Sequence, residues 1–446
     1  MPGVPSGKGC AACRKQKKKC DQGKPACSRC TRLRIECVGS GEQRYTFKNQ
    51  SVAVTAAGSS QAISIPTQAI APAPTPSNAM TLAASGFMSA LQVTDIRYDL
   101  SIYGAFFKEI PRRMGTNDAL DASVYALTKA SSSVRTHQVS PELYDSYSYA
   151  LKMLRVCLDD PEKTRSSETL CAIYLLMILQ GWIGKRDDQC PNHGEVMAYL
   201  LNAAVPNKWE GQFESDLLVT LTIIAIMESF FNPKIRLEPW LLIFPEHFGP
   251  RSAPSDMSVI ESLKIRALAR VPEFLQHPSL YWNEIRVYYQ QLQADTATMR
   301  TVHTSIQNAF HSPDTPGSAL HILRRHHVRY STAYGIVLCI AIILNAVICS
   351  YEPTISLAHE SAIFVDIVID LAEQASQYRP LGSSSMPLFL MAALAVTDDL
   401  AKRTHVERVL LEYQNDFSSA RWIDMSSWLR SKLADHRFDC SLNYLQ

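Results

Sequence analysis

From about Asp95 onward, apolar residues recur at intervals of three and four, the period of an amphipathic α-helix. Ser140, Pro141 and Glu142 form a helix start, with an N-cap residue, a proline at the first position and an acid in the first turn. The alternation typical of strands is nearly absent. The pattern predicts a large all-α domain over residues 95–446. Helices are expected at about 96–109, 117–131, 140–157, from Thr164–Glu168 onward, 192–204, 213–231, 256–275, 279–310, 318–350, 355–377, 385–402, 404–416 and 422–434.

Residues 331–350 carry no charge and include the run GIVLCIAIILNAVIC, so they are either a buried helix or a membrane span. The apolar core of this run is about 15 residues long, shorter than the roughly 20 residues that cross a bilayer. Asn345 interrupts it, and Arg324 and His326 precede it on the same predicted helix. We therefore expect a buried core helix and no membrane contact.

The residues before this domain have a different composition. No charged residue occurs from Asn49 to Thr94, and Ala, Ser, Thr, Pro and Gln dominate, with Phe87 as the sole aromatic residue. Such a segment buries too little apolar surface to order itself. We predict a disordered, flexible linker over residues 38–94, in which the uncharged stretch from Asn49 to Thr94 has a root-mean-square span of about 35–40 Å.

Charge is distributed unevenly along the 446 residues. Residues 1–50 have a net charge of +9 and the remainder has −7, although the whole chain is only +2. A small basic segment joined to a mildly acidic body is typical of a polyanion-binding module carried by a separate domain.

Six cysteines in the basic segment follow the spacing C-x2-C-x6-C twice, and the second half repeats the first at an offset of 17 residues. They are Cys10, Cys13, Cys20, Cys27, Cys30 and Cys37. Thiolates are soft ligands for zinc, and a C-x2-C pair places two of them on one tight turn. Two tetrahedral zinc ions can share six sulfurs if two of the sulfurs bridge. No coordination position is then left for water, so the zinc would be structural.

The alternative for six cysteines is a disulfide framework. That framework is typical of secreted domains with an apolar leader, and residues 1–9 contain no apolar run. The other six cysteines are scattered, mostly within apolar stretches, as is usual for reduced core residues. They are Cys157, Cys171, Cys190, Cys339, Cys349 and Cys440. We therefore expect zinc binding in a reducing compartment.

At these residues the sequence resembles the fungal-type zinc binuclear cluster family of transcription factors. All six cysteines fit the family pattern without a gap, with Arg14, Lys17 and Lys19 in the basic run and Pro25 in the connecting loop. The resemblance covers only about 28 residues, from Cys10 to Cys37. It implies two zinc ions per chain and a zinc-stapled DNA-binding domain over residues 10–37.

The resemblance also implies how the ligands divide. Cys10 and Cys27 would bridge the two zinc ions. One ion would bind Cys13 and Cys20 in addition, and the other ion would bind Cys30 and Cys37.

The two halves of the cysteine repeat differ in charge. Five cations and no acid lie between Cys13 and Cys20, whereas the stretch between Cys30 and Cys37 has a net charge of +1. We expect the first half to bind double-stranded DNA, with a helix that carries residues 14–19 entering the major groove. The expected DNA-binding residues are Arg14, Lys15, Lys17, Lys18 and Lys19.

The resemblance implies a CGG-like target triplet. Lys17 and Lys18 would then contact guanine, and Arg14, Lys15 and Lys19 would contact phosphates. The alternative is a zinc-stapled module that binds protein or RNA, in which the basic run serves nuclear import. No leucine heptads follow the cysteines directly, which departs from the many relatives that dimerise there.

The all-α body resembles the fungal-specific transcription factor domain that commonly follows the zinc cluster. This resemblance implies a regulatory domain over 95–446 that contacts the transcription machinery or a second copy of the chain in a homodimer, acts in the nucleus and regulates RNA polymerase II genes. We predict no enzyme activity: His359 and Glu360 begin the run HESAI, which lacks the second histidine of a zinc protease, and no phosphate-binding or nucleophile motif occurs. The target genes, the direction of regulation and any effector ligand are not encoded in a recognisable pattern.

Overall fold

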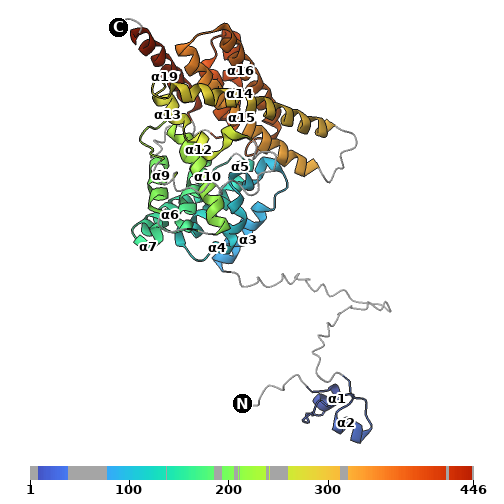
Figure 1. Cartoon of the computed structure of the whole chain (residues 1–446). Helices are drawn as coiled ribbons and strands as arrows, with labels where there is room; N and C mark the ends of the chain where they lie inside the picture. Colours follow the sequence, from blue (N-terminus) through green and yellow to red (C-terminus); the bar gives the residue numbers. More distant parts are fainter. Residues whose placement is uncertain are drawn as a thin grey trace, which may run out of the picture. The chain divides into compact units, whose positions relative to one another are not determined.

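The structure of the chain is a computed structural model that describes residues 9–38, 78–136, 138–184, 193–204, 209, 211–237, 241, 260–311, 320–417 and 421–443. Within these residues all regular structure is helical and no strand occurs. The chain divides into two compact units, Met1–Pro74 and Thr75–Gln446 (Figure 1). A small N-terminal unit and a helical body are therefore confirmed.

The small unit contains α1 (Ala11–Lys15) and α2 (Ser28–Leu33), which contact each other. Neither helix contributes a large apolar side chain to a core. Cys10, Cys13, Cys27 and Cys30 are the fully buried residues of this unit among those described. A unit of this size without an apolar core needs another source of folding energy, and bound metal is the usual one.

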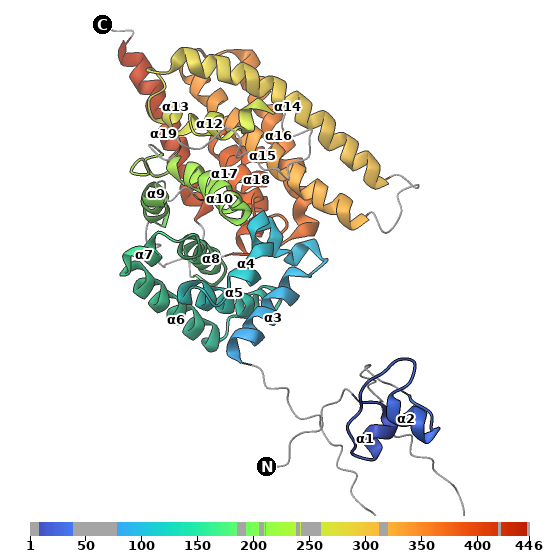
Figure 2. The ribbon, with the colours of Figure 1, turned by 60° about the horizontal axis from the view of Figure 1, so that its bottom comes forward.

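The first part of the helical unit is built around α5 (Asp118–Thr136) and α8 (Ser167–Ile183), which pack on each other and on α6 (Pro141–Leu158) (Figure 2). α3 (Ala79–Leu91) packs on α5, and α9 (His193–Ala204) packs on α10 (Gln212–Ser229). The shorter elements are η1 (Ile96–Tyr98), η2 (Leu100–Tyr103), η3 (Ala105–Glu109), α4 (Ile110–Arg113) and α7 (Pro161–Thr164).

The second part surrounds α15 (Leu320–Tyr351), which packs against α14 (Trp282–His311), α16 (Ile355–Ala375), α17 (Met386–Val396) and α19 (Trp422–Asn443). Figure 2 shows α14 running along α15. α18 (Leu400–Gln414) packs on α17. The remaining elements are η6 (Glu261–Leu263), α12 (Ile265–Leu268), α13 (Val271–Gln276) and η8 (Ser376–Tyr378).

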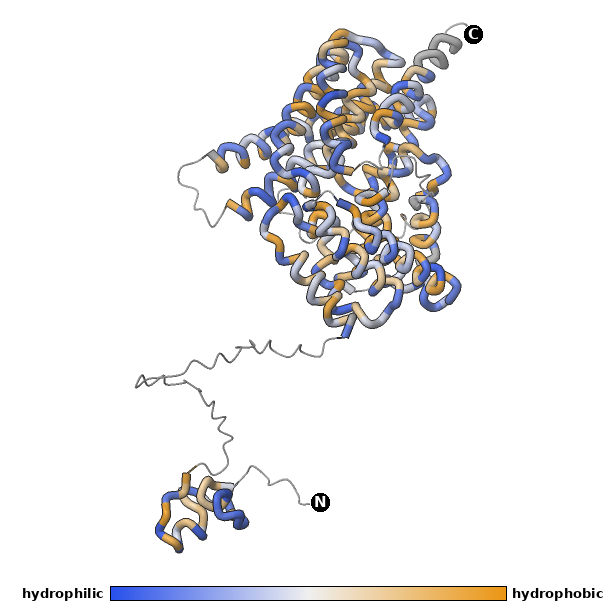
Figure 3. Tube along the Cα trace, turned by 180° about the vertical axis from the view of Figure 1, so that it is seen from behind, coloured by the Kyte–Doolittle hydropathy of each residue, from blue (hydrophilic) through white to orange (hydrophobic). Residues whose placement is uncertain are grey.

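Among the described residues, α15 is the one helix long and apolar enough to cross a membrane, and 78% of its most apolar window is buried inside the fold. Its apolar residues meet neighbouring helices on all sides, and Asn345 donates hydrogen bonds to the Tyr289 hydroxyl and the Leu357 carbonyl. The predicted buried core helix is confirmed. Figure 3 shows apolar and polar positions intermixed along the helices of this unit, as is usual for helices that bury one face.

The predicted linker over residues 38–94 is wrong at its C-terminal end. Residues 39–77 lie outside the described residues, but α3 begins at Ala79. The Asn78 side chain caps the helix by accepting a hydrogen bond from the Thr81 N–H at 2.7 Å. Phe87 is fully buried and its ring lies 6.3 Å from that of Phe107. The N-cap, the buried Phe87 and Ala83, and the packing of Ala90 and Leu91 on the core order this uncharged stretch on the domain.

Three predicted helices are broken, two of them at a capping carboxylate. Residues 96–109 form three short 3₁₀ turns, because Asp95 and Asp99 each accept the N–H two residues later and start a new turn. Residues 385–402 do not form one helix either: α17 ends at Val396, and Asp399 caps α18 by accepting the Lys402 N–H at 2.7 Å. Local carboxylate capping overrides the apolar period in these two places.

The third broken helix is the one predicted at 256–275. Its described residues form η6, α12 and α13. Lys264 has an extended backbone between η6 and α12, and Pro272 lies in the first turn of α13, where its missing N–H is tolerated.

Candidate metal centre and nucleic-acid interface

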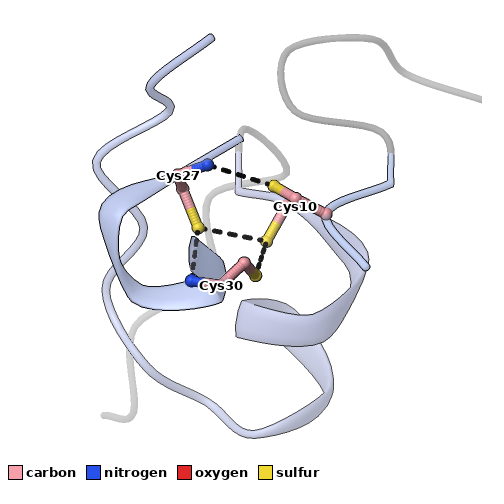
Figure 4. Close-up of side chains that lie close together, drawn as sticks. Cys10, Cys27 and Cys30 are labelled. Carbon is pink, nitrogen blue, oxygen red and sulfur yellow. Dashed lines mark hydrogen bonds between the residues drawn. The ribbon is translucent and has the colours of Figure 1, made fainter. Parts of the chain in front are cut away.

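Each C-x2-C pair sits at the start of a helix. Cys10 is the N-cap of α1 and its sulfur accepts the Cys13 N–H at 3.5 Å. Cys27 is the N-cap of α2 and its sulfur accepts the Cys30 N–H at 3.4 Å (Figure 4). The helix N-terminus therefore orients one sulfur of each pair and stabilises negative charge on it.

The sulfurs form two groups of four. One contains Cys10, Cys13, Cys20 and Cys27, and the other contains Cys10, Cys27, Cys30 and Cys37; within each group the sulfurs lie within 4.8 Å of one another. The two groups share Cys10 and Cys27, which are the residues expected to bridge.

Individual sulfur distances match tetrahedral zinc coordination. Cys10 Sγ lies 3.8 Å from Cys27 Sγ and 3.6 Å from Cys30 Sγ (Figure 4). Cys13 Sγ lies 3.8 Å from Cys27 Sγ. Two sulfurs bound at about 2.3 Å to one tetrahedral zinc ion are about 3.8 Å apart. The donor set and its spacing therefore fit two zinc ions that share two thiolates.

The 17-residue repeat of the sequence is also a repeat of structure. The Cys10 N–H donates to Cys20 Sγ at 3.5 Å, and the Cys27 N–H donates to Cys37 Sγ at 3.3 Å. The third cysteine of each half is thus held in the same way.

Both helices also end in the same way. Lys17 and Arg34 both have φ of 50°, the left-handed conformation that reverses the chain after a helix. The Lys17 N–H donates to the Arg14 carbonyl at 3.0 Å, and the Arg34 N–H donates to the Thr31 carbonyl at 3.2 Å.

The thiols differ in acidity for a geometric reason. The Cys13 N–H lowers the pKa of the Cys10 thiol, and the Cys30 N–H lowers that of Cys27. Burial instead raises the pKa of Cys13 to about 11 and also raises the pKa of Cys30. The two shared sulfurs are therefore the most easily ionised of these four, as suits ligands that serve two cations.

Residues 8–46 match the family model of the fungal Zn(2)-Cys(6) binuclear cluster domain. Domains of this family bind zinc through their cysteines and belong to DNA-binding transcription factors, which are generally not enzymes. No curated protein and no solved structure matches the chain. The family match ends at residue 46, so the fungal-specific transcription factor domain expected over 95–446 stays a prediction.

The basic run of the zinc cluster is not a single helix. α1 ends at Lys15, Gln16 is its C-cap, and Lys17 turns the chain, so Lys17, Lys18 and Lys19 follow the helix. The predicted helix over residues 14–19 is therefore wrong. The reason is that Cys13 and Cys20 belong to one sulfur group, and the chain between them must reverse to close it.

All five cations of the run are exposed: Arg14, Lys15, Lys17, Lys18 and Lys19. The equivalent stretch of the second half exposes Leu33 and Ile35, at 46% and 38%, together with two cations and one acid, Arg32, Arg34 and Glu36. The charge asymmetry predicted from the sequence thus lies on the surface, where a polyanion can reach it.

Sequence reasoning missed Arg29, which joins the two halves of the zinc cluster. Its NH2 nitrogen donates to Gln16 Oε1 at 2.6 Å, and its NH1 nitrogen lies 4.0 Å from Cys13 Sγ. The sequence shows a cation between the ligands Cys27 and Cys30. Its partner, Gln16, is brought to it only by the packing of α2 on α1, which the sequence does not reveal.

Asp21 holds the loop that connects the halves. Its carboxylate accepts the Ser28 N–H at 3.1 Å and the Ser28 hydroxyl, and the hydroxyl contact is the main cause that lowers the pKa of Asp21. The first residue of α2 is therefore held by Asp21 in the connecting loop as well as by the N-cap residue Cys27.

Proposed function

We propose that the chain is a nuclear, sequence-specific DNA-binding regulator of RNA polymerase II genes. Its zinc cluster reads a CGG-like triplet in the major groove through the segment between Cys13 and Cys20. The observation that carries the proposal is that five exposed cations occupy a segment whose two ends belong to the same sulfur group. A basic segment held at both ends retains its shape when it meets DNA, so little order has to be gained on binding.

Within this segment, Lys17 and Lys18 contact bases and Arg14, Lys15 and Lys19 contact phosphates. Lysine donates to guanine O6 and N7, which lie together in the major groove and distinguish G·C from A·T pairs. Lys17 lies at the chain reversal, in the middle of the segment between Cys13 and Cys20. Arg14 and Lys15 lie on α1, next to the metal ligands, and Lys19 directly precedes Cys20.

The zinc ions supply folding energy and rigidity, and no open coordination position for chemistry. Cys10, Cys13, Cys20, Cys27, Cys30 and Cys37 would hold them. The helical unit over residues 75–446 regulates the activity of the cluster or contacts the transcription machinery, and the chain acts as a monomer or as a homodimer through this unit.

Fluorescence anisotropy of the zinc-loaded full chain tests the proposal. Binding is measured on a CGG-containing duplex, on a scrambled duplex of equal length, and on an RNA of the same sequence. We expect the CGG duplex to bind at least about a hundredfold more tightly than the scrambled one, and chelation of zinc to abolish binding. Equal affinity for both duplexes, or preference for the RNA, would reject sequence-specific DNA reading and favour the interaction-module alternative.

A further inference from the structure

A cavity of about 240 Å³ lies in the helical unit, between its two parts. Its walls include Tyr103 at the end of η2, Gly181 and Trp182 at the end of α8, Asp416 and Phe417 after α18, and Trp422 at the start of α19. The volume far exceeds the roughly 10–15 Å³ needed by one water molecule. Ligand sites form preferentially at such junctions.

Five of the eleven residues that line the cavity are aromatic: Tyr103, Trp182, Tyr413, Phe417 and Trp422. The rings of Trp182 and Phe417 are nearly parallel, at 17°, with centroids 6.5 Å apart. The Trp182 indole N–H donates to the Tyr103 hydroxyl at 3.0 Å, which fixes the indole plane. Trp182, Phe417 and Trp422 are only partly buried, so the cavity reaches the surface. Preoriented ring faces at a surface opening favour a flat aromatic guest.

Gly181 keeps the cavity open. It lies inside α8 with an ordinary helical backbone, so the chain does not need glycine there for conformational reasons. A Cβ placed on it meets no atom within 4 Å. Glycine in a helix interior is unfavourable relative to alanine. Because Gly181 lines the cavity, the missing side chain leaves space there at some cost to the stability of the helix.

The cavity is also lined by one carboxylate, that of Asp416. Arg379 donates to both carboxylate oxygens of Asp416, at 2.7 and 2.9 Å, and the guanidinium lies over the Tyr413 ring. Each carboxylate oxygen can accept a second hydrogen bond. Because Arg379 already balances the charge of Asp416, a charged guest would bring an uncompensated charge into a partly buried site.

We propose that this cavity binds an uncharged, planar aromatic molecule that carries a hydroxyl or N–H donor, with the ring between the aromatic walls and the donor on Asp416. Such a ligand contacts α8 and the segments around α18 together, so it stabilises the packing of the two parts of the helical unit. The proposal does not depend on DNA binding, and its test does not use DNA.

The test is isothermal titration calorimetry of the zinc-loaded full chain with 2-naphthol, an uncharged bicyclic phenol. Cyclohexanol, which has the hydroxyl but no ring face, is the control ligand. We expect saturable one-to-one binding of 2-naphthol and none of cyclohexanol. Absence of saturable 2-naphthol binding, or equal binding of cyclohexanol, would overturn the proposal.

Substitutions in the cavity wall test whether 2-naphthol binds in this cavity. Gly181→Leu fills the cavity and is expected to weaken 2-naphthol binding by about tenfold or more, whereas Gly181→Ala adds one carbon in open space and retains binding. Phe417→Leu removes one ring face from a partly exposed position and is also expected to weaken binding. Circular dichroism checks that each variant folds. If Gly181→Leu does not fold, the affinity of Phe417→Leu for 2-naphthol decides whether the ligand binds in this cavity. Wild-type affinity in the folded Gly181→Leu variant, or in Phe417→Leu, would place the ligand elsewhere and overturn the proposal.

Discussion

Arg29 donates a 2.6 Å hydrogen bond to Gln16, which joins the first turn of α2 to the C-cap of α1. The same guanidinium lies near Cys13 Sγ. Two Zn²⁺ ions bound by six thiolates carry a formal charge of about −2, so a cation at this place offsets part of it. Arg29 thus stabilises the metal centre from outside the ligand set.

Replacement of Arg29 by methionine, which keeps the apolar stem, is expected to speed the loss of zinc to a colorimetric chelator by about three- to tenfold, because a charge-assisted hydrogen bond is lost. Arg32→Met is the matched control, since Arg32 is an exposed cation on the same helix. Equal rates for the two variants would show that Arg29 does not support the centre.

The shared sulfurs give a second prediction. Cys10→Ala removes a ligand from both sulfur groups, whereas Cys37→Ala removes one from a single group and leaves the other complete. Native mass spectrometry is expected to find two zinc ions on the wild-type chain, one on Cys37→Ala and fewer than one on average on Cys10→Ala. If Cys10→Ala and Cys37→Ala retain the same amount of zinc, Cys10 does not bridge.

A pair of helix glycines gives predictions of opposite sign. Gly181→Ala adds a methyl group in open space, and its better helix propensity should raise the free energy of unfolding by about 0.5–1 kcal/mol. Gly335 lies in α15 against the ring of Phe389, and a methyl group there would overlap that ring. Gly335→Ala should lower the free energy of unfolding by about 1–3 kcal/mol.

Urea unfolding followed by circular dichroism measures both changes. If Gly181→Ala destabilises the chain, or if Gly335→Ala does not, the packing described around α8 or around α15 is wrong.

Patterns that depend on local chemistry were readable from the sequence. The cysteine spacing predicted a zinc site because each C-x2-C pair closes on its own helix turn, and the family resemblance implied which sulfurs are shared. α15 was predictable because a long uncharged apolar run has to be buried. α3 was missed because its order depends on Phe87 reaching a distant core. The bond from Arg29 to Gln16 and the cavity at Gly181 arise only when separate segments meet, and no local pattern encodes them.

The basic run shows how a ligand constraint overrides helix propensity. Lysine and glutamine are good helix formers, so residues 14–19 read as one helix. The chain instead reverses at Lys17, because Cys20 must return to the sulfur group that contains Cys13. Both halves show this reversal, which makes Arg34 a natural internal control for Lys17.

The salt dependence of DNA affinity tests whether Arg14 contacts a phosphate. Arg14→Ala should weaken binding to CGG and scrambled duplexes alike and reduce the slope of log affinity against log salt by about 0.9, because one phosphate contact is lost. Lys24→Ala, at an exposed lysine outside the basic run, is the control and should change the slope less. An unchanged slope in Arg14→Ala would show that Arg14 does not neutralise a phosphate.

Base reading by Lys17 is tested most directly by the effect of Lys17→Gly on discrimination between CGG and scrambled duplexes. Glycine accepts the left-handed backbone at this position, so only the side chain is lost, and Arg34→Gly makes the same change in the other half. We predict that Lys17→Gly lowers the preference for CGG by about 1–3 kcal/mol and that Arg34→Gly leaves it unchanged. Equal losses of affinity for both duplexes in Lys17→Gly, with the preference for CGG intact, would contradict base reading by this residue.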